Sequence, residues 1–456
     1  MFRRSLRRGL GVILIVAMGF AAPPVAADED RVERLERELE ALRATVEALQ
    51  AEQADADRLA EIDRKLDVLA AELEDLKVGE AAVVATEEAM AYGLAPAASK
   101  VYRTETGLSI GGYGEALLEV FDSTRDDGQP SDKVDTFDLL RGVLYFGYKF
   151  DESFVFNSEI EFEHSSTDQE GSASVEFAYV DWLWRAELNV RGGLLLVPMG
   201  FVNELHEPTT FLGAKRSETE SRIIPTTWRE NGVGIHGDLG GFTYRTYLVN
   251  GFDASGFSSS GLRGGRQKGS KAKAEDMAWV GRVDWTATPG LIAGASAYVG
   301  DSGQDLVDES ERSIGVGTTI WEVHADWRWR GLQIRGLWSV ADLDDVAELN
   351  EALGYQGGDS VGERMEGAYV EIGYDFLSRR PGSQALIPYL RWEQVDTQAE
   401  VPAGYARKGS TDVEVLTLGL AYQPIEQLIL KIDWQDREDA AGTGVDQFNV
   451  GLGYIF

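Results

Sequence analysis

The amino-acid sequence predicts an all-β transmembrane barrel of about 16 antiparallel strands, preceded by an N-terminal α-helical coiled coil. Residues 107–456 alternate apolar and polar side chains over stretches of 10–15 residues, which suits tilted strands that cross a bilayer. Residues 28–77 instead repeat apolar residues with heptad spacing. The chain holds 51 Gly and only 12 Pro, with 11 Trp, 16 Tyr and 18 Phe, a composition that favours strands over helices.

The N-terminus predicts export from the cytoplasm. Four arginines within the first eight residues precede an apolar run at residues 11–22, and small residues at 25–27 form a cleavage site. The apolar run is too short to span a bilayer as a helix. We therefore interpret residues 1–27 as a signal peptide and expect the mature chain to begin at Asp28; a retained anchor is the alternative.

The next segment, residues 28–77, predicts a coiled coil. Apolar residues recur at spacings of three and four from Val32 to Leu49 and, after a break, from Leu59 to Leu76. So narrow an apolar seam needs partner helices, so an oligomeric coiled coil is favoured over a lone charged helix, although the seam does not set the number of chains. Residues 78–106 lose the heptad and gain Ala, Gly and Pro, and are predicted to be a linker.

The alternation of apolar and polar residues in 107–456 predicts sixteen strands, an even number as bacterial outer-membrane barrels require. The predicted strands are 107–121, 134–150, 153–165, 172–184, 187–197, 231–239, 242–252, 276–288, 291–300, 314–329, 332–341, 363–377, 384–396, 412–422, 428–437 and 444–456. Connections after even-numbered strands are short, whereas most others are long and polar, up to the 33 residues of 198–230. This asymmetry is typical of periplasmic turns and outer loops.

The alternation also predicts which side chains line the lumen. If the apolar set meets lipid, basic residues of the other set face inward, among many acidic ones. So many charges inside the ring indicate water, because isolated buried charges are costly; pairing across the wall is the alternative. The basic lumen candidates are Arg141, Arg191, Arg245, Arg282, Arg328, Arg335, Arg391 and Lys431.

The third outer loop is unusually apolar. It follows Val197 and contains three prolines together with Phe201, Phe211 and Trp228. A loop of this kind is more stable folded into the lumen than in solvent, so we expect it to narrow the pore; an exposed lid or a trimer contact is the alternative. The candidate constriction residues are Glu204, His206, Glu207, Lys215, Arg216, Arg222 and Arg229.

Several functions are disfavoured by composition. The absence of Cys excludes a disulfide scaffold, a thiolate metal site and cysteine catalysis, and the four His are well spread. The net charge of −34 argues against a nucleic-acid partner. His206 beside Glu204 and Glu207 is the one cluster that suggests catalysis, and no nucleophile is marked near it. We expect no enzyme activity, no cofactor and no metal.

Two tracts resemble a known family. The segment PMGFVNELHEPTTF, continued by IIPTTWRENGVGIHG, is similar to the region around the third loop of the phosphate-selective porin O/P family, and GLSIGGYGE at residues 107–115 resembles the start of that family's barrel. The resemblance covers roughly residues 100–456 in architecture. It implies a trimeric, sixteen-stranded diffusion porin with an inward third loop, in which members that select phosphate carry pore arginines and loop lysines.

These observations together predict an outer-membrane porin of a Gram-negative bacterium, with its coiled coil in the periplasm. The expected partners are outer-membrane lipid and lipopolysaccharide, two further copies in a homotrimer, and small hydrophilic solutes or ions, with anions such as phosphate among them. Residues 100–456 hold 31 basic and 57 acidic residues, so charge balance leaves the selectivity open. The alternative is a structural anchor whose coiled coil reaches toward peptidoglycan.

The domain division is testable by truncation. Deleting residues 28–77 should leave the barrel able to fold and insert, because strand pairing in residues 107–456 does not involve them. Heat-modifiable mobility of the folded barrel on gels measures this, and a truncated chain that never folds in detergent would contradict the division.

Overall fold

The computed structural model describes residues 92–456, apart from 166–170, 309 and 381. The predicted signal peptide, the coiled coil of residues 28–77 and residues 78–91 of the predicted linker lie outside the described residues. In the part that is described, no helix has the length and apolar character needed to cross a membrane.

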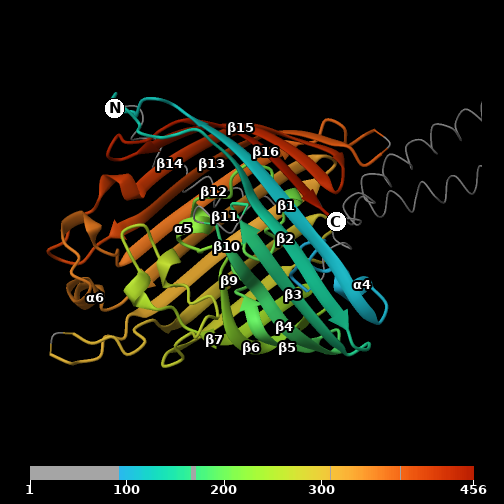
Figure 1. Cartoon of the computed structure of the whole chain (residues 1–456), viewed down its shortest axis with the longest axis horizontal. Coiled ribbons are helices and arrows are strands. Elements are labelled where there is room, and N and C mark those ends of the chain that lie inside the picture. The colour runs from blue at the N-terminus through green and yellow to red at the C-terminus, as the bar shows by residue number, and fades with distance from the viewer. Residues whose placement is uncertain (1–91, 166–170, 309, 381) are drawn as a thin grey trace, which may run out of the picture. The chain divides into compact units, whose positions relative to one another are not determined.

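The described chain forms one closed antiparallel barrel, in which every strand pairs with its neighbour in sequence and β1 pairs with β16 (Figure 1). This confirms the predicted antiparallel barrel and its sixteen strands. The strands are β1 (Gly107–Phe121), β2 (Thr136–Lys149), β3 (Phe154–Glu163), β4 (Ala173–Arg185), β5 (Leu188–Leu196), β6 (Arg229–Asp238), β7 (Phe242–Asn250), β8 (Met277–Trp285), β9 (Leu291–Asp301), β10 (Gly317–Trp329), β11 (Leu332–Leu343), β12 (Arg364–Tyr374), β13 (Ala385–Glu400), β14 (Asp412–Ile425), β15 (Leu428–Asp439) and β16 (Gln447–Ile455).

Closure satisfies the backbone of every strand. The register of β1 with β16 runs from Tyr113↔Ile455 to Phe121↔Gln447, and that of β1 with β2 starts at Gly107↔Lys149. A closed ring has no edge with unpaired N–H and C=O groups, which hydrocarbon could not solvate. The final strand is therefore indispensable to the wall.

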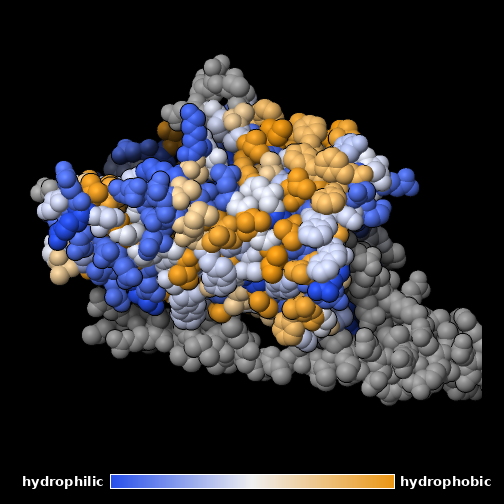
Figure 2. All heavy atoms as spheres, turned by 90° about the horizontal axis from the view of Figure 1, so that it is seen from below, coloured by the Kyte–Doolittle hydropathy of each residue, from blue (hydrophilic) through white to orange (hydrophobic). Residues whose placement is uncertain are grey.

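The two faces of the wall differ as the alternation predicts. In β1, Leu108 and Ile110 are 64% and 46% exposed on the outside, whereas Ser109 and Tyr113 are buried inside. Hydrophobic side chains cover the barrel wall and hydrophilic ones gather at the end with the long loops (Figure 2). Aromatic pairs ring the opposite end, where the short turns lie: Phe154–Trp182, Phe242–Trp285, Trp327–Trp329 and Tyr374–Phe376. This arrangement is typical of a lipid-facing belt with an interfacial girdle.

The segment just before β1 corrects the predicted linker. Residues 92–106 do not form a spacer, because Leu94, Ala98 and Val101 are buried against the inner wall. A short helix, α4 (Lys100–Arg103), lies at the end of the barrel that carries the short turns (Figure 1). Small and apolar residues allow this close packing, and in the sequence they are indistinguishable from a flexible linker.

Two long loops enter the barrel from the other end. The first, residues 197–228, contains η1 (Pro208–Thr210) and α5 (Thr219–Arg222); the second, residues 251–276, contains η2 (Ala254–Gly256) and η3 (Arg263–Gly265). The rings of Trp228 and Phe252 stack with centroids 4.4 Å apart, and Tyr298 of β9 packs against both. Apolar side chains therefore pack together inside the barrel as well as covering its outer surface.

The lipid-facing assignment predicts a depth-dependent penalty for charge. Leu418, near the middle of β14, is 58% exposed on the outer face. Leu418→Arg should lower the free energy of unfolding by about 2–4 kcal/mol, because the guanidinium would lie in hydrocarbon. Denaturant unfolding in lipid vesicles measures this. Val307→Arg, at an exposed site in an outer loop, is the control, and an equal penalty for both would contradict the assignment.

Candidate channel constriction

The third outer loop folds into the lumen, as predicted from its apolar residues. Met199, Phe201, Ile223, Ile224 and Trp228 are almost fully buried. Burying these side chains inside the barrel removes their apolar surface from water, which favours the inward position by the hydrophobic effect. The cost is that an irregular backbone must then find hydrogen-bond partners within the lumen.

One buried asparagine joins the two ends of this loop. The side chain of Asn203 donates to the carbonyl oxygens of Val197 (2.6 Å) and Trp228 (2.9 Å) and accepts from the Trp228 backbone N–H (2.6 Å). Backbone N–H groups also reach the Val197 and Trp228 oxygens, whereas the buried Trp228 N–H donates to Asn203. Sequence reasoning missed Asn203, because its partner Trp228 lies 25 positions away.

Carboxylates of the barrel wall and of the loop itself accept hydrogen bonds from loop backbone. Asp433 of β15 accepts from the Ala214 N–H at 2.7 Å. Glu393 of β13 accepts from the first N–H groups around α5, those of Glu218 and Thr219. Within the loop, Glu220 accepts from the Val202 N–H (2.6 Å) and from the hydroxyl of Tyr369 on β12 (2.6 Å).

Basic side chains of the wall donate hydrogen bonds to backbone carbonyl oxygens of the loop. Arg335 donates to the oxygen of Thr210 (3.1 Å), Lys431 to that of Gly213 (2.9 Å) and Arg391 to that of Lys215 (3.3 Å). Arg282 on the opposite side donates to the oxygen of Gly200. The loop is thus attached around most of the barrel circumference.

All eight basic residues predicted for the lumen lie on the inner face. Six of them are nearly fully buried beneath the loop or, in the case of Arg191, beneath the segment before β1, and Arg141 and Arg328 are half-buried. Most pair with acidic neighbours: Arg141 with Glu115, Arg191 with Asp181, Arg245 and Arg282 with Asp284, Arg328 and Arg335 with Asp326, and Arg391 with Glu371. Much of the inner charge is therefore used for pairing and for holding the loop.

Three of the seven constriction candidates are buried where the loop meets the wall. Glu204 lies 3.1 Å from Arg245 and 3.6 Å from Arg282. His206 Nε2 lies 3.1 Å from both oxygens of Glu159, and although burial alone would lower its pKa, that carboxylate raises it. Burial raises the pKa of Glu207 to about 7. These side chains position the loop and do not face a passage.

The other candidates lie mostly on the outer side of the loop. Lys215 contacts Glu119 of β1 (2.8 Å), and Arg222 contacts Glu218 (2.6 Å). Burial alone would raise the pKa of Glu218, but Arg437 and Arg222 lower it to about 2. Arg216 donates to the oxygen of His206 at 3.3 Å. Lys215, Arg216 and Arg222 are all half-buried.

Arg229 is placed differently from the other six candidates. It is the first residue of β6 and contacts Glu176 of β4 at 2.5 Å. It therefore belongs to the wall and not to the loop, because β6 begins two residues earlier than the predicted 231.

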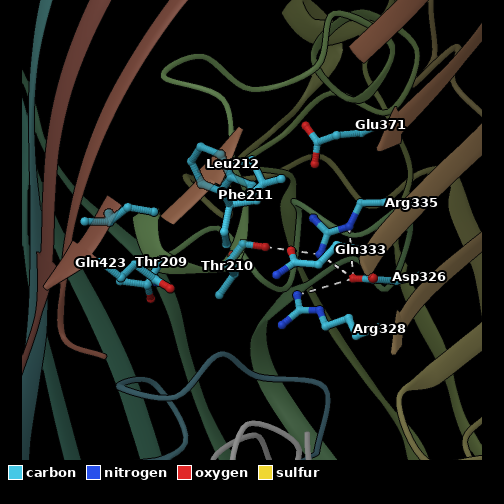
Figure 3. A pocket seen from close by; sticks show the side chains of 12 residues that line it. Thr209, Thr210, Phe211, Leu212, Asp326, Arg328, Gln333, Arg335, Glu371 and Gln423 are labelled. Carbon is cyan, nitrogen blue, oxygen red and sulfur yellow. Dashed lines mark hydrogen bonds and ion pairs between the residues drawn. The ribbon is translucent and has the colours of Figure 1, made fainter. Parts of the chain in front are cut away.

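Cavities lie on both sides of the loop. The outer cavity, of about 440 Å³, is lined by Glu119, Phe121, Lys133, Lys215, Glu218, Arg437, Thr443, Val445 and Gln447. A smaller one of about 40 Å³ lies toward the short turns, lined by loop residues 209–212 and the wall residues Asp326, Arg328, Gln333, Arg335, Glu371, Ile387, Gln423 and Ile429. Figure 3 shows Arg328 and Arg335 converging on Asp326 in this smaller cavity. Loop residues 208–216 separate the two cavities.

Comparison with known proteins places the chain in a family. No family model matches it. It is 37% identical over 358 residues to an uncharacterized protein of Aquifex aeolicus (strain VF5), covering 76% of this chain and 79% of that protein. The chain belongs to one family with that Aquifex protein.

Solved structures show a barrel fold like that of this chain. The chain is similar to OmpF of Salmonella typhi, solved in complex with daunomycin, with a TM-score of 0.50, 11% identity and coverage of 76% of this chain and 97% of that one. It is also similar to an anion-selective porin from Comamonas acidovorans, with a TM-score of 0.49, 12% identity and coverage of 77% and 100%. The family member described here shares the porin-like sixteen-stranded barrel.

The hydrogen bonds by which Asn203 joins the two ends of the third loop predict how the loop can be released. Asn203→Ala should destabilise the loop by about 1–3 kcal/mol, because the buried Trp228 N–H would be left unpaired. Trypsin should then cleave after Lys215 or Arg216 faster, while the barrel keeps its folded mobility. Asn350→Ala is the matched control, because Asn350 makes similar bonds to Val361 in another outer loop. An unchanged cleavage rate in Asn203→Ala would contradict the inference that Asn203 holds the two ends of the loop together.

Proposed function

We propose that this protein is an outer-membrane porin of a Gram-negative bacterium, through which small hydrophilic solutes or ions diffuse passively. The observation that carries the proposal is the pair of cavities with charged linings on the two sides of an inward loop, within one closed barrel. Residues 208–216 between them are the proposed constriction. A charged lining lowers the cost of moving a polar solute out of bulk water.

The charges at the outer rim support weak selectivity. Lys133, Lys215 and Arg437 share the outer cavity with Glu119 and Glu218. Both signs therefore face the proposed path within a few ångströms of each other, as the 2.8 Å contact of Lys215 with Glu119 illustrates. Mixed charges of this kind create a local transverse field rather than a barrier to one sign.

A finer proposal is that anions, phosphate among them, are the favoured solutes. The second inward loop presents Arg263, Arg266 and Lys268. Burial, together with repulsion by Arg263 and Arg229, lowers the pKa of Arg266 to about 9. Crowded cations attract anions locally even in an acidic chain. The resemblance of residues 107–115 and of the third loop to the phosphate-selective porin O/P family supports the same proposal.

The remaining parts of the proposal concern assembly. We propose a homotrimer embedded in outer-membrane lipid and lipopolysaccharide, with the heptads of residues 28–77 joining three chains in the periplasm. A structural anchor is the second candidate function. The tight filling of the lumen by residues 197–228 favours it, because an anchor needs no open path. Single-channel steps in planar bilayers separate the two functions, since an anchor with a filled barrel would give none.

The position of Arg216 and Arg222 in the third loop predicts a change of ion selectivity when their charges are reversed. Arg216→Glu with Arg222→Glu should shift the reversal potential toward cations, because Arg216 lies in the proposed constriction, Arg222 pairs with Glu218 of the outer cavity, and neither takes part in strand pairing. The measurement is the reversal potential in a salt gradient across a planar bilayer. Arg379→Glu with Arg380→Glu, in an exposed short turn, gives the same change in net charge away from the loop. Equal potentials for both double variants would place the loop outside the permeation path.

A further inference from the structure

Residues 92–104 occupy the end of the barrel that carries the short turns. Leu94, Ala95, Ala98 and Ser99 are almost fully buried there. The segment lies along the inner face of β1–β7: Gly111 of β1 is close to Ala97, the ring of Tyr92 meets that of His236 on β6, and Gly93 approaches Arg245 of β7. The small cavity of about 40 Å³ lies against β10–β15 instead. One half of this opening is therefore filled by the chain's own N-terminal segment.

Polar contacts hold the segment against the wall. Asn157 of β3 donates to the oxygen of Ala98 (2.8 Å), and the hydroxyl of Tyr102 donates to Asp181 of β4 (2.5 Å). Arg191 of β5 donates to the same hydroxyl at 3.2 Å. The wall beneath the segment thus carries charged and amide side chains beside the apolar ones that pack on Leu94 and Ala98, and water can solvate these polar groups when the segment leaves.

The segment is also bound to the inward loop. Both oxygens of Glu207 accept backbone hydrogen bonds from it, Oε2 from the Ala97 N–H at 3.1 Å and Oε1 from the Ala98 N–H at 2.8 Å. Gly93 lies so close to Glu204 and Arg245 that a Cβ there would be 2.8 Å from each. The loop that forms the proposed constriction therefore rests on the segment, and moving one disturbs the other.

The fit of the segment depends on one glycine of the wall. A Cβ built on Gly147 of β2 would lie 2.5 Å from the Cβ of Val101. Gly147 pairs with Ser109 and Asn157 through its backbone alone. A methyl group at this position would therefore displace the segment without removing any strand hydrogen bond.

We propose that residues 92–104 are a withdrawable plug, bound to the β1–β7 wall and to Glu207 of the inward loop, that obstructs the periplasmic opening. The inference rests on the proposed channel function. The central part of the plug, GLAPAAS at residues 93–99, has mostly small side chains, so little side-chain volume must move there when the plug leaves. Its departure exposes the polar wall to water and removes the support beneath Glu207, so the path past the loop widens.

Thiol reactivity tests the plug directly, because the chain contains no Cys. Ser99→Cys places a near-isosteric thiol in the buried part of the plug, and Glu105→Cys places one at an exposed position just beyond it. In the full-length folded chain, a membrane-impermeant maleimide should modify Cys at 99 much more slowly than Cys at 105. Gly147→Ala should raise the rate at 99 roughly tenfold or more and leave the rate at 105 unchanged.

Matched variants separate displacement of the plug from general damage. Gly142→Ala is the control on the same strand, because a Cβ at Gly142 meets nothing within 4 Å. Val101→Gly combined with Gly147→Ala removes the clash and should restore protection of position 99. Glu207→Gln, which loses one of the two acceptors, should also raise the rate at 99. Folded mobility on gels shows that each barrel is intact.

Conductance measured on the same variants completes the test. Gly147→Ala should raise single-channel conductance, and neither Gly142→Ala nor the rescued double variant should. Protection of position 99 in folded Gly147→Ala would overturn the plug, because the segment would then be a fixed part of the wall. Exposure of position 99 without any rise in conductance would overturn the obstruction. Reactivity at 99 that follows the variants while no form carries current would instead overturn the channel function itself.

Discussion

The structure depends on one constraint: an irregular backbone placed inside a closed barrel must have its N–H and C=O groups satisfied by side chains of the wall, by the loop's own side chains or by water. Strands satisfy their own backbones by closing the ring, but the third loop has no ladder to join. Asp433, Glu393 and Lys431 supply acceptors and a donor that meet loop backbone directly. The charged interior is therefore part of the fold, since it allows a loop with apolar side chains to remain in the lumen.

This constraint changes how the inner charges relate to function. Arg335 both pairs with Asp326 and donates to the oxygen of Thr210. A guanidinium held by two such partners keeps one orientation and is less free to interact with a passing solute. The side chains that border the cavities, such as Lys215 and Arg437 on the outer side, are better placed to interact with solutes. Selectivity in such a channel would thus come from a small subset of the inner charges.

The same reasoning connects the N-terminal segment to the loop. The carboxylate of Glu207 accepts hydrogen bonds from two backbone N–H groups, those of residues 97 and 98. Backbone groups of two irregular segments therefore depend on each other within the lumen. A conformational change in either one leaves polar groups of the other unpaired, unless water enters. Opening of the lumen and hydration of its wall would be a single coupled event.

The sequence by itself determined the wall of this protein. A period of two sets which side chains face lipid, and short and long connections alternate, so the strand number, the sidedness and the inward-facing residues followed from local pattern alone. The apolar character of the third loop likewise predicted its inward fold. Local pattern could not reveal contacts between distant positions: Asn203 with Trp228, Lys431 with Gly213, or Glu207 with Ala98. Nor could it separate a linker from residues 92–106, because small residues serve both flexibility and close packing. Only the tertiary structure decided which charges hold the loop and which border a cavity, because hydrogen bonding and burial depend on where the loop crosses the lumen.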